Sequence, residues 1–267
     1  MLLSPSRPRS STVQVANSQA WEYQPPASAQ TARRILVKPN LGYPVGPPAT
    51  VSMGALGTVL RGLRQVNPNA EILIVEGVCS PMPLAEIASR NGLYAQLDEG
   101  MTLIDADTLP LKEYPNRSPQ PVRFKTLWVP TLLEEVDCRI SVGALKQTQL
   151  KGEPLISACL KNLYGLLPRS HYKARSPHSR GQLHRPSVPQ VLQDVYFTFG
   201  HWFDGGVVDA DQKFHSADWK PDKGRAIALH KVFFGDDLIA VDRTACEVGE
   251  EPMPSYLTAI EQLRSQP

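Results

Sequence analysis

Polar side chains follow four apolar runs of the chain at the point where each predicted strand ends. Lys38 and Asn40 follow the first run, and Glu76 follows the second. Lys146 follows the third and Asp209 the fourth. Because the ligand crevice of an open parallel sheet lies outside the carboxyl ends of its strands, we expect these groups to converge at one edge. The lysines would bind negative groups, Asn40 would orient the ligand, and Glu76 or Asp209 would serve as acid or base.

A predicted helix over 154–167 places Lys161 opposite the centre of its apolar arc. The side chains around this lysine are small, namely those of Ser157, Ala158 and Gly165. A solvent-exposed face ordinarily carries long polar side chains, so the pattern indicates that a ligand or another element comes close. We expect Lys161 to bind a negative group or, as a buried lysine near other cations, to act as nucleophile or base, and Asn162 to bind the same ligand. The alternative for Lys161 is an ordinary solvent-exposed helix face. The alternative for Lys38 is a lysine at a strand end whose aliphatic stem covers apolar surface.

The segment 169–185 contains eight basic or histidine residues and no acidic residue. Clustered positive charge of this kind attracts phosphates and carboxylates. Because the segment directly follows Lys161, we expect it to close over a ligand as a cationic lid, with Arg175 and His178 among the binding residues. A solvated, mobile loop is the alternative interpretation.

The sequence supports neither a metal site nor a common cofactor motif. The four cysteines are scattered without a C-x-x-C pair, and no two histidines stand at i and i+4. The chain has no G-x-x-x-x-G-K-[ST] loop, no G-x-G-x-x-G turn after a strand, no G-x-S-x-G elbow and no H-E-x-x-H. We therefore expect no metal, and the cofactor stays unknown.

The elements that must position these residues alternate between strands and helices. Short apolar runs at 34–38 and 71–76 flank a helix over 53–66, which indicates a parallel pair with a helical crossover. A helix over 84–96, apolar pieces at 102–104 and 127–129 and a strand at 139–142 repeat the pattern. Later expectations are a helix at 188–199, a strand at 226–234 and a helix at 238–246, capped by an aspartate. The predicted fold is α/β: a mainly parallel sheet flanked by helices in three layers, with a basic loop inserted after the Lys161 helix.

The composition is that of a globular protein with an irregular beginning. The chain has 267 residues, 42% of them hydrophobic, and a net charge of +2, which disfavours a general nucleic-acid coating role. Eight of the 25 prolines fall within the first 50 residues, so we expect a disordered or loosely packed arm over 1–32. A single α/β domain over 33–250 and a C-terminal helix or tail over 251–267 follow. Without a predicted signal or membrane span, we expect a cytoplasmic protein.

Four motifs in order resemble the family catalogued as domain of unknown function 362. They are V-K-P-N-L at 37–41, L-K at 145–146, L-K-N-L-Y-G-L-L-P at 160–168 and D-L-I-A-V-D at 237–242. The resemblance implies an α/β domain found in prokaryotes, sometimes joined to a ferredoxin-like module and without one agreed activity. The chain departs from the family where Gln147 and Thr148 follow Lys146 in place of a frequent threonine-histidine pair, and where Leu238 replaces a proline. Its plan is also faintly similar to the amino-terminal domain of nickel-pincer lactate racemases, from which we carry no metal across.

Three hypotheses for function follow from these observations. The leading one is an enzyme of small-molecule metabolism that binds an anionic substrate or cofactor at the carboxyl edge of the sheet. The second is a non-catalytic binding or regulatory protein that uses Arg175, Arg180 and Arg185 on a polyanion or partner. The third is a redox-associated subunit that relies on a separate ferredoxin-like partner. The sequence leaves the substrate, the reaction and the oligomeric state unknown.

Overall fold

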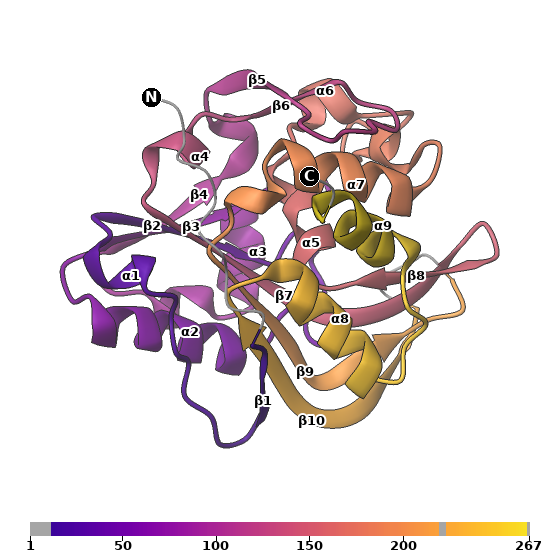
Figure 1. Ribbon diagram of the computed structural model, residues 1–267. Helices are drawn as coiled ribbons and strands as arrows, with labels where there is room; N and C mark the ends of the chain where they lie inside the picture. The colour runs from indigo at the N-terminus through magenta and orange to yellow at the C-terminus, as the bar shows by residue number, and fades with distance from the viewer. Residues whose placement is uncertain (1–11, 219–222, 266–267) are drawn as a thin grey trace.

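A mixed, mostly parallel sheet forms the centre of the molecule in the computed structural model, which describes residues 12–218 and 223–265 (Figure 1). Five neighbouring strands are parallel, in the order β9-β7-β2-β3-β4. The strands β10 and β1 extend one edge in antiparallel fashion, and β8 pairs with the far half of β7. The bounds are β1 Gln14–Asn17, β2 Arg34–Pro39, β3 Glu71–Glu76, β4 Met101–Asp105, β7 Cys138–Leu150, β8 Glu153–Ser157, β9 Gly205–His215 and β10 Arg225–Gly235.

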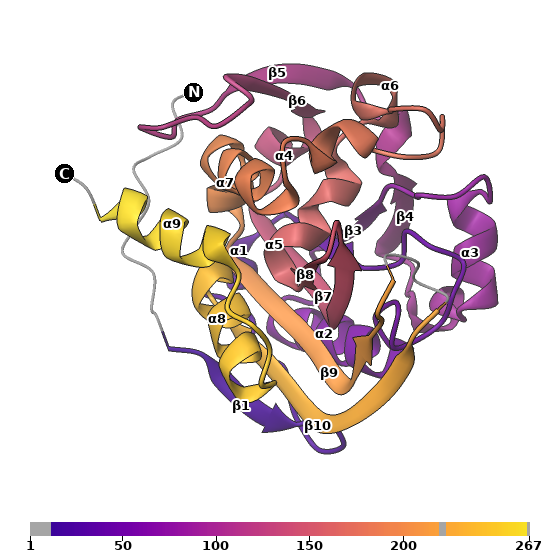
Figure 2. The same ribbon diagram turned by 90° about the vertical axis from the view of Figure 1, so that its right-hand side faces the viewer.

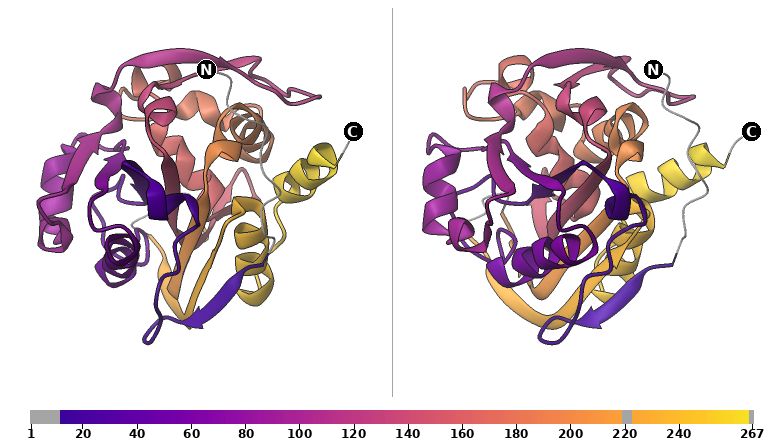
Figure 3. Two further views of the ribbon diagram at one scale, coloured as in Figure 1. Left: turned by 60° about the vertical axis from the view of Figure 1, so that its left-hand side comes forward. Right: turned by 90° about the vertical axis from the view of Figure 1, so that its left-hand side faces the viewer.

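Helices cover both faces of this sheet, so the predicted three-layer α/β fold is confirmed. The helices α1 (Ser28–Thr31) and α2 (Met53–Val66) lie on one face. The other face is covered by α4 (Leu132–Glu135), α5 (Cys159–Asn162), α7 (Val188–Thr198), α8 (Leu238–Val248) and α9 (Ser255–Arg264). Figure 3 shows α2 and α8 on opposite sides of the sheet.

Each face has its own hydrophobic core because successive strand residues point to opposite sides. In β2, Ile35 and Val37 enter the core beneath α2, whereas Leu36 enters the core beneath α5 and α8. The predicted apolar stripe of α2 is buried as expected, and Ser52 caps this helix by accepting a hydrogen bond from Ala55 N at 3.1 Å. Strands buried on both faces explain the nearly continuous apolar runs in the sequence.

Two smaller predictions are corrected by local geometry. The helix expected over 84–96 ends early, as α3 (Leu84–Arg90), because Gly92 adopts a φ of 75° before the 3-10 turn η1 (Leu93–Gln96). The apolar piece at 127–129 is a strand, β6 (Thr126–Pro130), but it pairs with β5 (Leu111–Pro115) in a separate two-stranded sheet. A further 3-10 turn, η2, spans Ala106–Thr108.

The largest correction concerns the region of Lys146 and Lys161. The strand expected to end at residue 142 continues to Leu150 and turns back as β8, so the first residues of the predicted helix over 154–167 are a strand. Lys151 and Gly152 occupy the turn with φ of 55° and 85°, the left-handed pair that a tight two-residue hairpin requires. Helical structure begins only at α5 and continues as the 3-10 turn η3 (Leu163–Leu166). Lys146 therefore lies within a long strand instead of after a short one.

The N-terminal arm and the basic segment are more ordered than predicted. From residue 12 the arm packs on the sheet: β1 pairs with β10 (Figure 2), and the buried Tyr23 lies against Phe234. The expectation for residues 1–11 falls outside the described residues. The basic segment folds into α6 (Arg169–Tyr172) and η4 (Gly181–His184), where Tyr172 and Leu183 are buried, and the stretch 173–177 between them is exposed.

The remaining elements agree with their predictions. The strand expected at 226–234 is β10, the helices expected at 188–199 and 238–246 are α7 and α8, and the C-terminal segment contains α9. Asp237 caps α8 by accepting hydrogen bonds from Ile239 N and Ala240 N, and the 3-10 turn η5 (Gly200–Trp202) follows α7. In the described part of the chain, every helix is too short or too polar to cross a membrane.

Candidate functional site

A buried ion pair joins the ends of β2 and β3. Lys38 Nζ lies 2.7 Å from Glu76 Oε1, and both side chains are almost fully enclosed. The Glu76 carboxylate also accepts hydrogen bonds from Leu41 N at 2.7 Å and Gly77 N at 2.8 Å, both in the loops that follow the two strands. With three donors around it, the Glu76 carboxylate acts only as a hydrogen-bond acceptor. It fixes the two loops and is not free to serve as acid or base.

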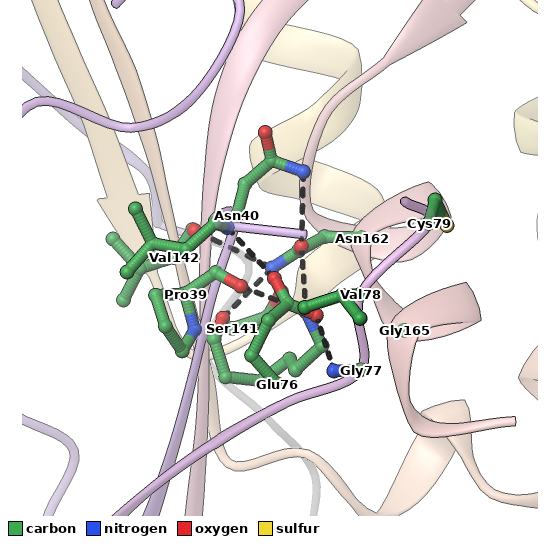
Figure 4. A network of polar contacts seen from close by, with 12 residues as sticks. Pro39, Asn40, Glu76, Gly77, Val78, Cys79, Ser141, Val142, Asn162 and Gly165 are labelled. Atoms are coloured by element: carbon green, nitrogen blue, oxygen red, sulfur yellow. Dashed lines mark hydrogen bonds and ion pairs between the residues drawn. The ribbon is translucent and has the colours of Figure 1, made fainter. Parts of the chain in front are cut away.

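Asn162 of α5 connects this ion pair to the neighbouring strands (Figure 4). Its amide oxygen accepts from Lys38 Nζ at 3.0 Å, while its amide nitrogen donates to Lys38 O at 2.7 Å and Ser141 Oγ at 3.1 Å. Lys38 Nζ also donates to Pro39 O at 2.7 Å, which uses its third proton. Burial lowers the pKa of Lys38, and Glu76 opposes that shift. Lys38 and Asn162, both predicted to bind ligand, have their polar atoms occupied within the protein.

Two glycines allow the backbone to close over the ion pair. A Cβ on Gly165 would lie 2.6 Å from Lys38 Cε and 2.8 Å from Lys38 Nζ. A Cβ on Gly77 would overlap Gly165 O and the Arg180 guanidinium. These positions require glycine because of close approach, since neither has an unusual backbone conformation. This packing is the structural reason for a glycine in the run at 160–168.

Asp242 of α8 holds the short helix that carries Lys161. Its carboxylate accepts hydrogen bonds from Cys159 N at 2.7 Å and Leu160 N at 3.0 Å. These amides belong to the first turn of α5, where backbone N–H groups lack intrahelical partners. Burial raises the pKa of Asp242 to about 7, although these donors oppose the shift. The two motifs at 160–168 and 237–242 are thus parts of one structural unit.

A cavity of about 410 Å³ opens beside this network, at the carboxyl edge of the parallel strands. Its polar lining comes from the ends of β2 and β3 and the loops that follow them, from the β7–β8 hairpin, from α5 and from residues 179–184 of the basic segment. Aromatic and aliphatic side chains form the rest of its wall: Tyr43, Leu150, Leu155, Tyr164 and Phe214. The extended hairpin makes this pocket, because Lys146, Thr148, Leu155 and Ser157 all project from its two strands into the lining.

Lys146 is fixed in this cavity by two acceptors. Its Nζ donates to Asn40 Oδ1 at 2.8 Å and to Ala49 O at 2.9 Å. Burial, and to a lesser degree the neighbouring positive charge of Lys161, lower its pKa to about 7. Asn40 in turn orients Lys146, since its own amide nitrogen lies 3.4 Å from Asn162 Oδ1.

Lys161 also lines the cavity but has no hydrogen bond or ion pair within the described residues. Its Nζ lies 6.0 Å from the centre of the Tyr164 ring, at the outer limit of a cation–π contact. Burial lowers the pKa of this lysine as well. A charged group without a partner in a partly enclosed cavity is unfavourable alone, so an anionic ligand would be stabilised there.

Three residues of the site were not predicted to belong to it. Cys79, in the loop after β3, is the one exposed cysteine of the four and lines the cavity. The buried Arg180 donates to Cys79 Sγ at 3.2 Å and also to Val78 O at 3.0 Å, so it ties the basic segment to this loop. His184 lines the same cavity with a pKa lowered to about 4, mainly by burial. All three residues reach the cavity through long-range packing. The density of basic residues at 169–185 was the sequence signal for Arg180 and His184, and Cys79 had none.

The other predicted residues lie elsewhere. Asp209 accepts hydrogen bonds from Ser52 N at 2.8 Å and Asp211 N at 3.2 Å, so it anchors the start of α2 and does not line the cavity. His178 lines a separate, shallower hollow beside Arg169, and Arg175 is exposed away from both. Across residues 12–218 and 223–265, no three His, Cys, Asp or Glu side chains group as metal ligands.

Comparisons with known proteins match this chain to a family. A family model described as a domain of unknown function (DUF362) matches residues 35–247. Among solved structures, the lactate racemase apoprotein from Thermoanaerobacterium thermosaccharolyticum is similar at 15% identity and a TM-score of 0.49, over 82% of this chain. The aligned region is 49% of that structure, so the chain spans about half its length. No curated protein matches the chain.

Proposed function

This chain belongs to the domain of unknown function 362 family, and we propose that it is an enzyme of small-molecule metabolism that binds an organic anion in the cavity beside Lys146 and Lys161. The observation that carries the proposal is the Lys161 amino group, which lines the cavity without a hydrogen bond or ion pair among the described residues. Lys38, which also lines the cavity, is paired with Glu76, whereas Lys146 and Lys161 have no carboxylate paired with them among those residues. An anionic ligand would supply the missing counter-charge and would favour the protonated form of both lysines.

The walls of the cavity support a ligand with an apolar body. Phe214, Tyr164 and Leu155 are largely buried and contribute apolar surface, while Asn40 and Thr148 supply polar groups. A volume of about 410 Å³ lies within the range of small-molecule sites, which combine apolar walls with few polar groups. A carboxylate or phosphate joined to a short aliphatic or aromatic group fits this lining best.

The test is ligand binding by a lysine variant. Lys161→Met keeps the length of the side chain and removes its charge, whereas Lys173→Met removes an exposed charge outside the cavity and serves as control. A hydrogen bond to a charged group contributes about 1.5–3 kcal/mol, so we expect Lys161→Met to weaken binding about 10- to 100-fold and Lys173→Met to leave it unchanged. Equal affinity in wild type and Lys161→Met would refute the proposal.

Cys79 offers a readout that does not require knowledge of the reaction. Because the other three cysteines are buried, iodoacetamide should alkylate Cys79 first. An anion that occupies the cavity should slow this alkylation in proportion to its occupancy. A panel of aliphatic and aromatic carboxylates and phosphates can thus be ranked by mass spectrometry.

The polyanion hypothesis has less support from the geometry. It depended on Arg175, Arg180 and Arg185 acting together at the surface. The Arg180 guanidinium is buried and donates to backbone oxygens including Gly77 O and Gly165 O, so it is not accessible to a polyanion.

A further inference from the structure

We infer that the ligand of the cavity is an anion with a long aliphatic chain, whose head lies at Lys161 and whose chain passes His184 into a second hollow. This inference rests on the proposed function and names its substrate class. The second hollow, the β8 groove, has a volume of about 600 Å³ and lies between β8 and the first residues of α7 and α9 (Figure 1). Its lining comes from the segments 150–156, 184–190 and 252–256.

A wall one side chain thick separates the cavity from the β8 groove. Leu150, Leu155 and His184 line both hollows, so each presents one side to the cavity and another side to the groove. Leu150 and Leu155 come from the two strands of the β7–β8 hairpin, and His184 ends the 3-10 turn η4. The cavity therefore continues into the groove wherever one of these side chains turns aside.

His184 is the weakly held member of this wall. Its Nδ1 lies 3.3 Å from Arg180 O, which is long for a hydrogen bond, and its Nε2 has no partner among the described residues. The ring also makes an edge contact with Tyr164, with 6.3 Å between the ring centres. Burial lowers the pKa of His184 to about 4, so the ring is neutral near pH 7 and presents no charge to an aliphatic chain. Rotation of the ring gives up one long hydrogen bond and joins the two hollows.

The arrangement of charge sets the direction of the ligand. Lys146 and Lys161 line the cavity without a carboxylate partner among the described residues, so the anionic head belongs there. The Tyr164 ring neighbours both Lys161 and the wall, since its centre lies 6.0 Å from Lys161 Nζ and 6.3 Å from the centre of the His184 ring. A head at Lys161 therefore lies close enough to His184 for the chain behind it to cross the wall.

The β8 groove presents aliphatic surface that suits such a chain. Four of its lining residues are prolines, which have no backbone N–H group: Pro154, Pro189, Pro252 and Pro254. The charged residues of the lining, Lys151 and Glu153, lie at the exposed tip of the hairpin. Within residues 12–218 and 223–265, β8 pairs only with β7, and its proline disfavours the addition of a peptide as a further strand. An aliphatic chain, which needs no hydrogen-bond partner, fits this groove.

The first test is the dependence of binding on chain length. Alkylation of Cys79 by iodoacetamide is measured with straight-chain carboxylates from butanoate to decanoate, each below the concentration at which it forms micelles. The cavity takes the head and the first carbons, and each further CH2 group that enters the groove should tighten binding about fourfold. Octanoate should therefore protect Cys79 at concentrations about 100-fold lower than butanoate does.

Two groove variants test where the chain lies. Met253→Asp places a carboxylate in the groove, whereas Val248→Asp adds the same charge at the end of α8, outside both hollows. The two residues are 37% and 40% exposed, so both variants should fold. We expect Met253→Asp to weaken octanoate binding about tenfold, the effect of about two CH2 groups, and to leave butanoate binding unchanged. Val248→Asp should change neither, and Ser255→Trp, which fills the groove without a charge, should act like Met253→Asp.

A photoreactive ligand locates the chain directly. Decanoate that carries a diazirine near its terminal carbon is bound and irradiated, and mass spectrometry identifies the labelled peptides. We expect labels within 187–190 or 252–256, and unlabelled decanoate should prevent them. If short anions protect Cys79 but a longer chain brings no gain, or if the labels lie outside the groove, the inference is wrong and the proposed function stands. If neither these carboxylates nor the wider anion panel protects Cys79, both proposals fail.

Discussion

Replacement of Glu76 by glutamine should destabilise the protein strongly, because it leaves the Lys38 ammonium buried without a counter-ion. The two side chains are only 1% and 2% exposed, and their atoms are 2.7 Å apart. Removal of one partner from a buried pair costs about 3–5 kcal/mol. Glutamine also places an NH2 group where the carboxylate accepts from Leu41 N or Gly77 N, so at least one backbone donor loses its acceptor. For a chain of this size, the expected fall in Tm is about 6–20 °C.

Urea unfolding of wild type, Glu76→Gln, Lys38→Met, the double variant Lys38→Met/Glu76→Gln and one control variant tests this prediction. Glu134→Gln is the matched control, since Glu134 forms an exposed pair with Lys112 at 3.0 Å that should contribute at most about 1 kcal/mol. In the double variant Lys38→Met/Glu76→Gln no unpaired charge remains, so its destabilisation should be smaller than the sum of the two single changes. If Glu76→Gln changes the free energy of unfolding no more than Glu134→Gln does, the buried pair is not what holds the two loops.

Further predictions concern the supports of the cavity. The pKa of Asp242 is raised to about 7 from an unfolded value of about 4, so the unfolded chain loses this proton at lower pH than the folded protein does. Wild type should therefore lose stability relative to Asp242→Asn as pH rises from about 4 to about 7. A difference in urea midpoint between the two proteins that stays constant over this range contradicts the assignment. Gly165→Ala should lower Tm and abolish ligand protection of Cys79, because its Cβ would lie 2.6 Å from Lys38 Cε. Gly54→Ala, whose Cβ would meet only Ser52 Oγ at 3.9 Å, is the control and should be neutral or mildly stabilising; equal effects of the two substitutions would refute the packing argument. Asp237→Ala should cost about 1 kcal/mol in urea unfolding through loss of the α8 cap, and an unchanged midpoint would show that Asp237 Oδ1 does not stabilise Ile239 N and Ala240 N.

Much of the fold was predictable because its signals are local. The apolar runs of β2 and β3, with the stripe of α2 between them, specify a parallel pair through periodicity alone. The polar residues that follow the apolar runs then predicted that Lys38, Glu76 and Lys146 meet at one edge of the sheet. All three line the same cavity. Lys161 was predicted to meet a ligand from the small side chains around it on an expected helix, and it also lines the cavity.

The errors arose where pairing between distant residues overrides local pattern. Residues 154–157 were expected to start a helix, but they pair with residues 146–149 and form most of β8. The basic segment carries few apolar residues, yet Arg180 is drawn inside because its donors satisfy carbonyl oxygens of the loop after β3 and of η3. The strand that pairs with β8 and the acceptors of Arg180 cannot be identified from the sequences of these two segments alone.

The sequence by itself determined which chemical groups meet at the edge of the sheet, since parallel strands deliver the residues at their carboxyl ends to one place. It did not determine which of those groups are free. Hydrogen-bond and charge partners 35 to 124 positions apart in the chain occupy Lys38, Glu76 and Asn162, whereas Lys161 has no such partner among the described residues. Only the tertiary structure sets these partners, because the availability of a polar group depends on every donor and acceptor within about 3 Å of it.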